Sequence, residues 1–261
     1  MGTVVVAGDG GAERWQALVV GVAGSAQGED RAFAQSLDSQ LAFARALERG
    51  MPGLAEDDLA VLPEPLHGSE VTGRIAEFNL AHDEDARAGR TRPGLLFYYC
   101  GHGMAHEDGR LYLSTVESVD DDLNRARTGL ALADVLSAAR ATAWRRPRVV
   151  CILDCCFAGL ALEEPAAERA HLLLAVARDV MATHDSDKAE PTHFTGALVD
   201  VLHRGVPGAG EWIDLETLHR EAAAALVAAH GELRRPYQRT YRDSGSVPIG
   251  RNRAAADRAA D

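Results

Sequence analysis

The chain has 261 residues, of which 46% are hydrophobic and 25% are charged, so its composition is that of a soluble globular protein with one large domain or two small ones. Its formal net charge of −12 argues against a general nucleic-acid-binding protein and favours cationic partners. No apolar run reaches the roughly 18 residues of a membrane span. The N-terminus also lacks the basic flank and apolar core of a secretory signal. We therefore expect a cytoplasmic protein without a membrane segment.

Short apolar runs alternate along the chain with segments of helical spacing. The predicted strands span residues 17–24, 59–62, 95–99, 111–114, 149–153 and 171–176. The predicted helices span residues 33–49, 70–80, 130–140 and 215–229, and a further helix follows residues 192–195 and ends near Gly205. Ser69 is the expected N-cap of the helix 70–80, and Asp214 that of the helix 215–229. This alternation implies right-handed βαβ units and a mainly parallel sheet with helices on both faces.

The remaining segments are predicted to be less regular. Residues 81–93 are charged and are expected to be exposed, and residues 235–250 are expected to be irregular. Residues 1–14 are assigned to an N-terminal arm, 15–250 to one α/β domain and 251–261 to a flexible tail. No G-x-G-x-x-G follows the first strand, so the sequence does not support a dinucleotide site.

Four cysteines are present, and their spacing does not suggest a disulfide framework. They are Cys100, Cys151, Cys155 and Cys156. Two of them are adjacent, which fits a reducing cytosol better than an oxidising compartment. A zinc site is the alternative, but the paired C-x2-C spacing of such sites is missing.

Chemically active residues follow two of the predicted strands. The run 149–153 leads into Asp154, Cys155 and Cys156 and then turns at Gly159. The run 95–99 leads into Cys100 and then into a histidine, His102, that lies between two glycines. Ligands of open α/β sheets bind where parallel strands end. A thiol also needs a nearby base or imidazolium to become a good nucleophile at neutral pH.

The two motifs together resemble those of a known family. Residues 98–103, Tyr-Tyr-Cys-Gly-His-Gly, and residues 153–159, Leu-Asp-Cys-Cys-Phe-Ala-Gly, resemble the caspase-like peptidases of the metacaspase and bacterial orthocaspase branch. Cys156 follows His102 by 54 residues, and in caspases the histidine precedes the cysteine by roughly 50 residues. A weaker match extends from about Leu18 to Gly250. The resemblance implies a caspase-like three-layer sandwich, with a mainly parallel central sheet of about six strands.

The resemblance also implies a catalytic dyad. Cys156 is then the nucleophile and His102 the general base and acid, while the backbone N–H groups of Gly103 and Cys156 stabilise the oxyanion. The adjacent Cys155 is expected to point the other way and to pack in the core. The alternative is that Cys156 is a small buried hydrophobe and His102 a histidine of an exposed turn.

Asp154 and Cys100 are the candidate substrate-binding residues. Asp154 lies two residues before Cys156, and on an extended chain it shares the same side of the strand. A carboxylate there favours a cationic P1 side chain, and the resemblance places it in a pocket for Arg or Lys. Cys100 falls where the family often has a small polar residue. The alternative is that Asp154 caps a local turn.

Other features limit the specificity further. No Gln-Ala-Cys-x-Gly motif occurs, so cleavage after Asp is disfavoured. A second acid of the pocket remains open among Glu29, Asp30, Asp179 and Asp185. Few residues separate Gly159 from His171, which favours a single-chain enzyme, although Arg169 is a candidate self-cleavage site.

Three successive acids, Asp120, Asp121 and Asp122, are weak calcium candidates, because many metacaspases carry such an acidic cluster. A solvated acidic loop is the alternative, and no cofactor is required by the dyad itself.

The sequence therefore predicts a cysteine endopeptidase that cleaves protein or peptide substrates after Arg or Lys. By analogy with the family, we expect an activating partner or signal in a bacterial defence or regulated-death pathway. The alternatives are a catalytically silent scaffold with the same fold and a different hydrolase or a transferase, such as a transpeptidase, that uses the same dyad.

Overall fold

A six-stranded sheet forms the centre of the protein. The computed structural model describes residues 14–24, 35–176 and 190–256. The strands of the central sheet are β1 (Trp15–Gly21), β2 (Leu54–Pro63), β3 (Gly94–Cys100), β7 (Val149–Asp154), β8 (His171–Leu174) and β10 (Tyr237–Arg239). They lie in the order β10-β8-β7-β3-β1-β2, and all neighbours are parallel except β10, which runs antiparallel to β8. The predicted, mainly parallel sheet of about six strands is thus confirmed.

The inner strands are apolar because they are covered on both faces. Every residue of β1, β3, β7 and β8 is buried, whereas the edge strand β2 alternates between buried and exposed positions. Parallel strands buried in this way have near-continuous runs of hydrophobic residues, and this pattern made β1, β3 and β7 visible in the sequence.

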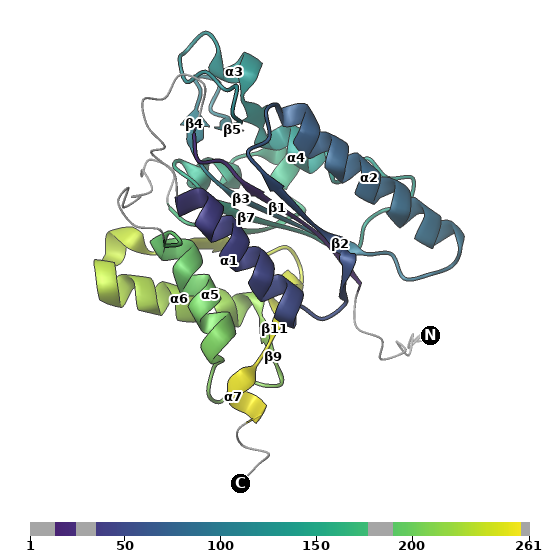
Figure 1. The fold of residues 1–261 in the computed structure, drawn as a ribbon, viewed down its shortest axis with the longest axis vertical. Helices are drawn as coiled ribbons and strands as arrows, with labels where there is room; N and C mark the ends of the chain where they lie inside the picture. The colour runs from purple at the N-terminus through teal and green to yellow at the C-terminus, as the bar shows by residue number, and fades with distance from the viewer. Residues whose placement is uncertain (1–13, 25–34, 177–189, 257–261) are drawn as a thin grey trace, which may run out of the picture.

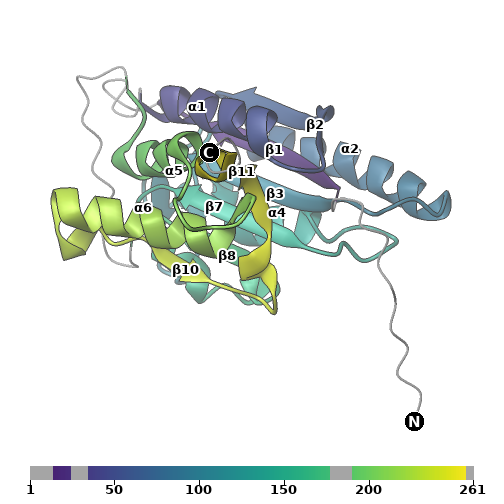
Figure 2. The ribbon, with the colours of Figure 1, turned by 90° about the horizontal axis from the view of Figure 1, so that it is seen from below.

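Helices pack on both faces of the sheet, as Figures 1 and 2 show. On one face lie α1 (Gln35–Gly50), α5 (His193–Arg204) and α6 (Leu215–His230), and on the other lie α2 (Gly68–Arg87) and α4 (Leu132–Ala138). Two short helices, α3 (Arg125–Thr128) and α7 (Arg253–Ala256), complete the set. Asp214 caps α6 as predicted, because its Oδ1 accepts a hydrogen bond of 2.8 Å from the N–H of Thr217. None of the helices that the structure describes combines the length and apolar character that a membrane crossing requires.

Smaller elements extend the two ends of the sheet. The strands β4 (Gly103–Ala105), β5 (Leu111–Leu113) and β6 (Leu130–Ala131) form an antiparallel sheet, and β9 (Trp212–Asp214) pairs with β11 (Pro248–Arg251). Four 3-10 helices are η1 (Ala158–Leu162), η2 (Pro165–Ala167), η3 (Glu232–Arg234) and η4 (Ser244–Ser246). The small sheet of β4, β5 and β6 carries the chain directly away from the end of β3.

The helix α2 differs from its predicted form. It begins at Gly68 rather than after Ser69 and continues to Arg87, into the segment expected to be exposed. Asp85 is buried there because it forms ion pairs with Arg14 and Arg90. Leu80, the last residue of the predicted helix, is 67% exposed.

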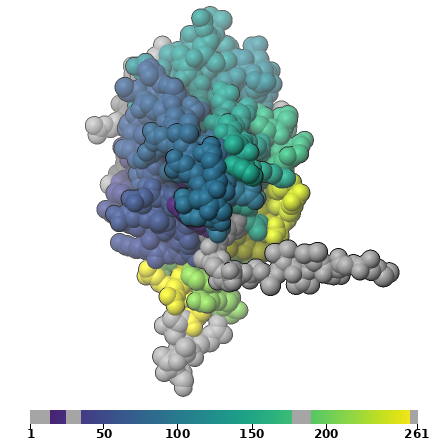
Figure 3. Space-filling view, turned by 90° about the vertical axis from the view of Figure 1, so that its right-hand side faces the viewer, coloured from purple at the N-terminus to yellow at the C-terminus, as the bar shows by residue number. Residues whose placement is uncertain are grey.

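The last strand of the sheet was also missed, because β10 lies in a segment predicted to be irregular. Of the proposed arm, only Arg14 lies within the described residues. Of the proposed tail, the structure describes residues 251–256, which include the end of β11 and the helix α7. The domain boundaries stay predictions. Figure 3 shows α2, in blue, across one side of the molecule, with teal segments and the yellow C-terminal segment beside it.

Candidate active site

The carboxyl ends of β3 and β7 lie side by side in the middle of the sheet. Cys100, the last residue of β3, pairs with Asp154, the last residue of β7. The N–H of Gly101 still donates to the carbonyl oxygen of Asp154 at 3.3 Å. Both motifs therefore leave the sheet at the same point, where ligands bind in open α/β sheets.

The histidine motif then packs directly on the cysteine motif. A Cβ atom placed on Gly103 would lie 2.0 Å from the carbonyl oxygen of Cys156 and 3.1 Å from Sγ of Cys155. The first distance is shorter than any real contact of a Cβ atom, and the second is a tight contact. Glycine at position 103 is thus what allows the turn that carries His102 to pack on the turn that carries Cys156.

Cys156 itself lies in a tight turn between β7 and η1. It is 1% exposed. The next residue, Phe157, has φ of 56° and ψ of 17°, a left-handed conformation that is unfavourable for a bulky side chain. Such strained residues often occur at functional sites, where the surrounding structure holds them in place. Cys155 is fully buried, as expected of a core residue, and burial raises the pKa of its thiol well above the usual value.

The backbone and the ring of His102 are both held in place. Its carbonyl oxygen accepts a hydrogen bond of 3.0 Å from the N–H of Ser114 and lies 3.1 Å from the hydroxyl oxygen of Tyr99. Its side chain is 25% exposed, and Nε2 lies 2.6 Å from Oδ2 of Asp120. A histidine nitrogen bound to a carboxylate carries the proton. The neutral ring therefore has its lone pair on Nδ1.

Asp120 is in turn held by a cation. Its Oδ1 accepts a hydrogen bond from Nε of Arg125, and Arg125 also donates to the carbonyl oxygen of Ala105 at 3.1 Å. Burial raises the pKa of Asp120, but the hydrogen bonds from Arg125 and His102 outweigh that effect and hold the pKa below its usual range. Asp120 is therefore ionised at neutral pH.

Sequence reasoning missed this role of Asp120. It placed Asp120 only in a calcium candidate with Asp121 and Asp122. In the structure Asp121 accepts hydrogen bonds from Leu123 and Asn124, and Asp122 pairs with Arg125 at 2.9 Å. Within the described ranges, no group of three His, Cys, Asp or Glu side chains is placed to hold a metal ion. This arrangement gives the calcium prediction no support, and it stays a prediction.

Asp154 lies inside the fold, at the floor of a small cavity. It is 1% exposed, and its Oδ2 accepts hydrogen bonds from the hydroxyls of Thr192 and Thr195, the latter at 2.6 Å. These threonines belong to the N-terminus of α5, so the alternative that Asp154 caps its own local turn is wrong. Both donors are hydroxyl groups that orient the carboxyl group, and Arg234 lines the same cavity.

The cavity beside Asp154 is narrow. Its volume is about 30 Å³, and Phe194 and Leu226 form part of its wall. That volume suits one or two water molecules, so an arginine side chain requires the cavity to widen.

The remaining substrate-binding candidates contribute less. Cys100 is fully buried next to Ser36 and Ser39, and burial, followed by the charge of Asp154, raises the pKa of its thiol well above the usual value. It is a core residue beside Asp154 in this structure. The candidate second acids, Glu29, Asp30, Asp179 and Asp185, lie outside the described residues.

Comparison with known proteins supports the fold. No family model and no curated protein matches the sequence. Among solved structures, caspase-1 from Spodoptera frugiperda superposes with a TM-score of 0.55 at 15% identity, covering 93% of this chain and 85% of that one. A structure described as pro-sf-caspase-1 gives a TM-score of 0.56 at 11% identity, covering 87% and 91%. The chain thus has a caspase-like fold, as the two motifs predicted, while the metacaspase branch stays a prediction.

The contact between Gly103 and Cys156 yields a stability prediction. Replacing Gly103 by Ala forces a methyl group against a backbone oxygen, and overpacking of this kind costs about 1–3 kcal/mol. We expect the melting temperature of Gly103→Ala to fall by several degrees. The control is Gly73→Ala, because an added Cβ at Gly73 meets no atom within 4 Å. Equal melting temperatures for Gly103→Ala and wild type would contradict the packing described here.

Proposed function

We propose that this protein is a cysteine endopeptidase in which Cys156 is the nucleophile and His102 the general base. The observation that carries the proposal is the approach of Gly103 to the backbone of Cys156, which puts the histidine turn on the cysteine turn. The caspase-like fold supports the same chemistry, since the two similar structures are described as caspases.

The proposed mechanism uses groups that converge on this point. His102 accepts the thiol proton of Cys156, and the thiolate attacks the carbonyl carbon of the scissile peptide bond. The N–H groups of Gly103 and Cys156 stabilise the negative oxygen of the tetrahedral intermediate. His102 then protonates the leaving amine, and a water molecule hydrolyses the thioester to release the second product and the thiol.

Asp120 acts as a positioning residue in this proposal. Its carboxylate fixes the imidazole through Nε2 and stabilises the imidazolium that forms when His102 accepts the thiol proton. Arg125 restrains Asp120 in that position. The dyad predicted from the sequence thereby becomes a chain of Cys156, His102 and Asp120.

A basic P1 residue suits the chemistry of Asp154. The hydrogen-bond donors that the structure describes at Asp154 are hydroxyl groups, and a substrate arginine can bind a carboxylate through two parallel hydrogen bonds. We therefore propose cleavage after Arg or Lys, with the cavity beside Asp154 widening to accept the side chain.

The burial of the site supports a gated enzyme. Cys156 and Asp154 are both buried, and a polypeptide substrate must reach both of them. Opening by a partner or a signal would meet this need, and a role in bacterial defence or regulated death extends the proposal by analogy with the family. A catalytically silent scaffold is the competing function, and the activity measurements below separate the two.

The P1 preference tests the role of Asp154. We expect fluorogenic peptides with Arg or Lys at P1 to be cleaved, with and without calcium, and Cys156→Ala to be inactive. Asp154→Asn keeps the shape of the side chain but removes its charge. It should therefore lower kcat/KM for the Arg peptide by roughly 100-fold, the usual effect of breaking a buried charge pair. Cleavage after Asp, or an Asn variant as active as wild type with an unchanged melting temperature, would refute this assignment.

The role of Asp120 is tested by thiol labelling across a pH series. Loss of its negative charge makes the imidazolium, and hence the thiolate, less favourable. We expect Asp120→Asn to raise the midpoint pH of iodoacetamide labelling at Cys156 by about one unit and to lower kcat. The matched control is Asp122→Asn, because Asp122 contacts Arg125 in the same loop. If the profile of Asp120→Asn coincides with those of the control and wild type, Asp120 does not position His102.

A further inference from the structure

A second pocket lies at the opposite end of the sheet from Cys156. It opens at the amino ends of β7 and β8, so Val149 at the start of β7 lines it while Cys156 follows the other end of that strand. Its volume is about 410 Å³, within the range of small-molecule sites. In Figure 3 the teal and green residues and the yellow C-terminal residues that supply its walls adjoin on one side of the molecule.

The lining of this pocket is strongly basic. Six arginines contribute to it: Arg92, Arg145, Arg146, Arg148, Arg169 and Arg242. Asp243 is the one carboxylate among its lining residues, and it pairs with Arg148 at 2.9 and 3.2 Å. This concentration of positive charge contrasts with the net charge of −12 for the whole chain.

One arginine of the pocket is built into the fold. Arg146 is 5% exposed and donates to Gln16 at 2.9 Å, Asn79 at 3.0 Å and the carbonyl oxygen of Pro93 at 3.1 Å. These acceptors are neutral, and burial lowers the pKa of Arg146 to about 10. Within the part of the chain that the structure describes, its buried Nε has no hydrogen-bond partner. A buried guanidinium of this kind is stabilised by an anion.

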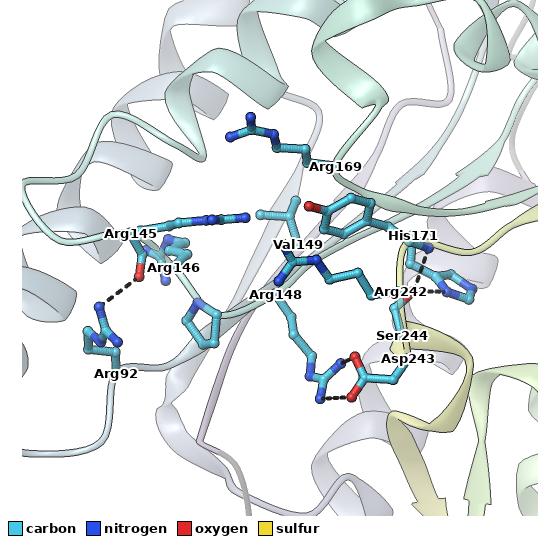
Figure 4. A pocket seen from close by; sticks show the side chains of 12 residues that line it. Arg92, Arg145, Arg146, Arg148, Val149, Arg169, His171, Arg242, Asp243 and Ser244 are labelled. Carbon is cyan, nitrogen blue, oxygen red and sulfur yellow. Dashed lines mark hydrogen bonds and ion pairs between the residues drawn. The ribbon is translucent and has the colours of Figure 1, made fainter. Parts of the chain in front are cut away.

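The exposed arginines are directed into the same space. Figure 4 shows Arg145 and Arg242 reaching toward the centre of the pocket from opposite sides, with Arg169 above them. The guanidinium of Arg242 lies over the ring of Tyr241 at 5.2 Å. Burial raises the pKa of Tyr241, but a hydrogen bond from Arg145 and the charges of Arg242, Arg145 and Arg169 more than offset this, so the pKa is lowered. The interior of the pocket therefore has a positive potential.

The pocket continues into a neighbouring hollow. That hollow has a volume of about 370 Å³, shares Arg145, Arg146, Arg148 and Arg169 with the first, and adds Arg140. A ligand that reaches both hollows meets guanidinium groups along its length. The arrangement fits two or more linked phosphates better than a single small anion.

We propose that this arginine pocket binds a small, multiply phosphorylated anion, either inorganic pyrophosphate or the polyphosphate group of a nucleotide. Guanidinium groups match phosphate oxygens through paired hydrogen bonds, which a lysine ammonium does not provide. The enclosed shape and the negative charge of the rest of the chain disfavour a long nucleic acid. The site is independent of the dyad, so the proposal does not depend on peptidase activity.

The test is isothermal titration calorimetry with sodium pyrophosphate and, separately, with ATP, at constant ionic strength. We expect saturable binding to wild type and to Cys156→Ala. Tighter binding of ATP than of pyrophosphate assigns a nucleotide, and the reverse assigns inorganic pyrophosphate. We expect Arg145→Gln/Arg169→Gln to bind at least about tenfold more weakly, as the loss of two charge-assisted contacts implies.

Two controls accompany the double variant. Both substituted arginines are exposed, and melting curves confirm that the variant is folded. Arg74→Gln/Arg220→Gln removes two exposed arginines that do not line the pocket and should bind like wild type. Asp243→Asn removes the carboxylate that competes for Arg148, so it should bind several-fold more tightly than wild type.

Several results would overturn the proposal. One is that neither ligand gives a heat of binding or a shift in melting temperature. A second is that the wild type and Arg145→Gln/Arg169→Gln bind with equal affinity. A third is that sulfate binds as tightly as pyrophosphate. The pocket would instead be a nucleic-acid site if single-stranded oligonucleotides bind more tightly than ATP and their affinity rises with their length.

Discussion

The contact of Gly103 with the backbone of Cys156 is the constraint on which the candidate active site depends. The register of β3 and β7, with Cys100 beside Asp154, brings both strand ends to the same place. A side chain at position 103 would then hold the two turns apart by colliding with the carbonyl oxygen of Cys156. Tyr99 and Ser114 hold the backbone of His102, and Asp120 holds its ring. The geometry of the candidate site is thus set mainly by backbone packing, which rigid strands can supply.

The two ends of the central sheet have opposite chemistry. At the carboxyl end lie the thiol of Cys156, the imidazole of His102 and two carboxylates, Asp154 and Asp120, and for Asp154 we propose a cationic substrate group as the partner. At the amino end lies the arginine pocket, which favours anions. The single strand β7 runs from one to the other, from Val149 to Asp154. A protein with an overall excess of acids therefore has a localised basic pocket at one end of the sheet, and we propose that the two ends bind different classes of ligand.

The sequence revealed the parts of the fold that have a strong local pattern. Buried apolar runs identified β1, β3 and β7, and the motifs that end β3 and β7 pointed to a caspase-like fold. The strand β10 was missed because Tyr237-Gln238-Arg239 is short and polar, and its pairing with β8 depends on the tertiary fold. Asp120 was missed as the partner of His102 because the small sheet of β4 and β5 brings it there. The arginine pocket was not foreseen, since its residues come from four separate segments of the chain.

The central claim is that the fold activates one thiol among four. Cys100, Cys151 and Cys155 are fully buried, and burial raises the pKa of each thiol. Brief iodoacetamide labelling of the folded protein near neutral pH, mapped by mass spectrometry, tests the claim directly. The account predicts labelling at Cys156, slowed strongly in His102→Gln, with the other three cysteines unmodified. Labelling of Cys156 that is no faster than that of the buried cysteines, or that is unchanged in His102→Gln, would contradict it.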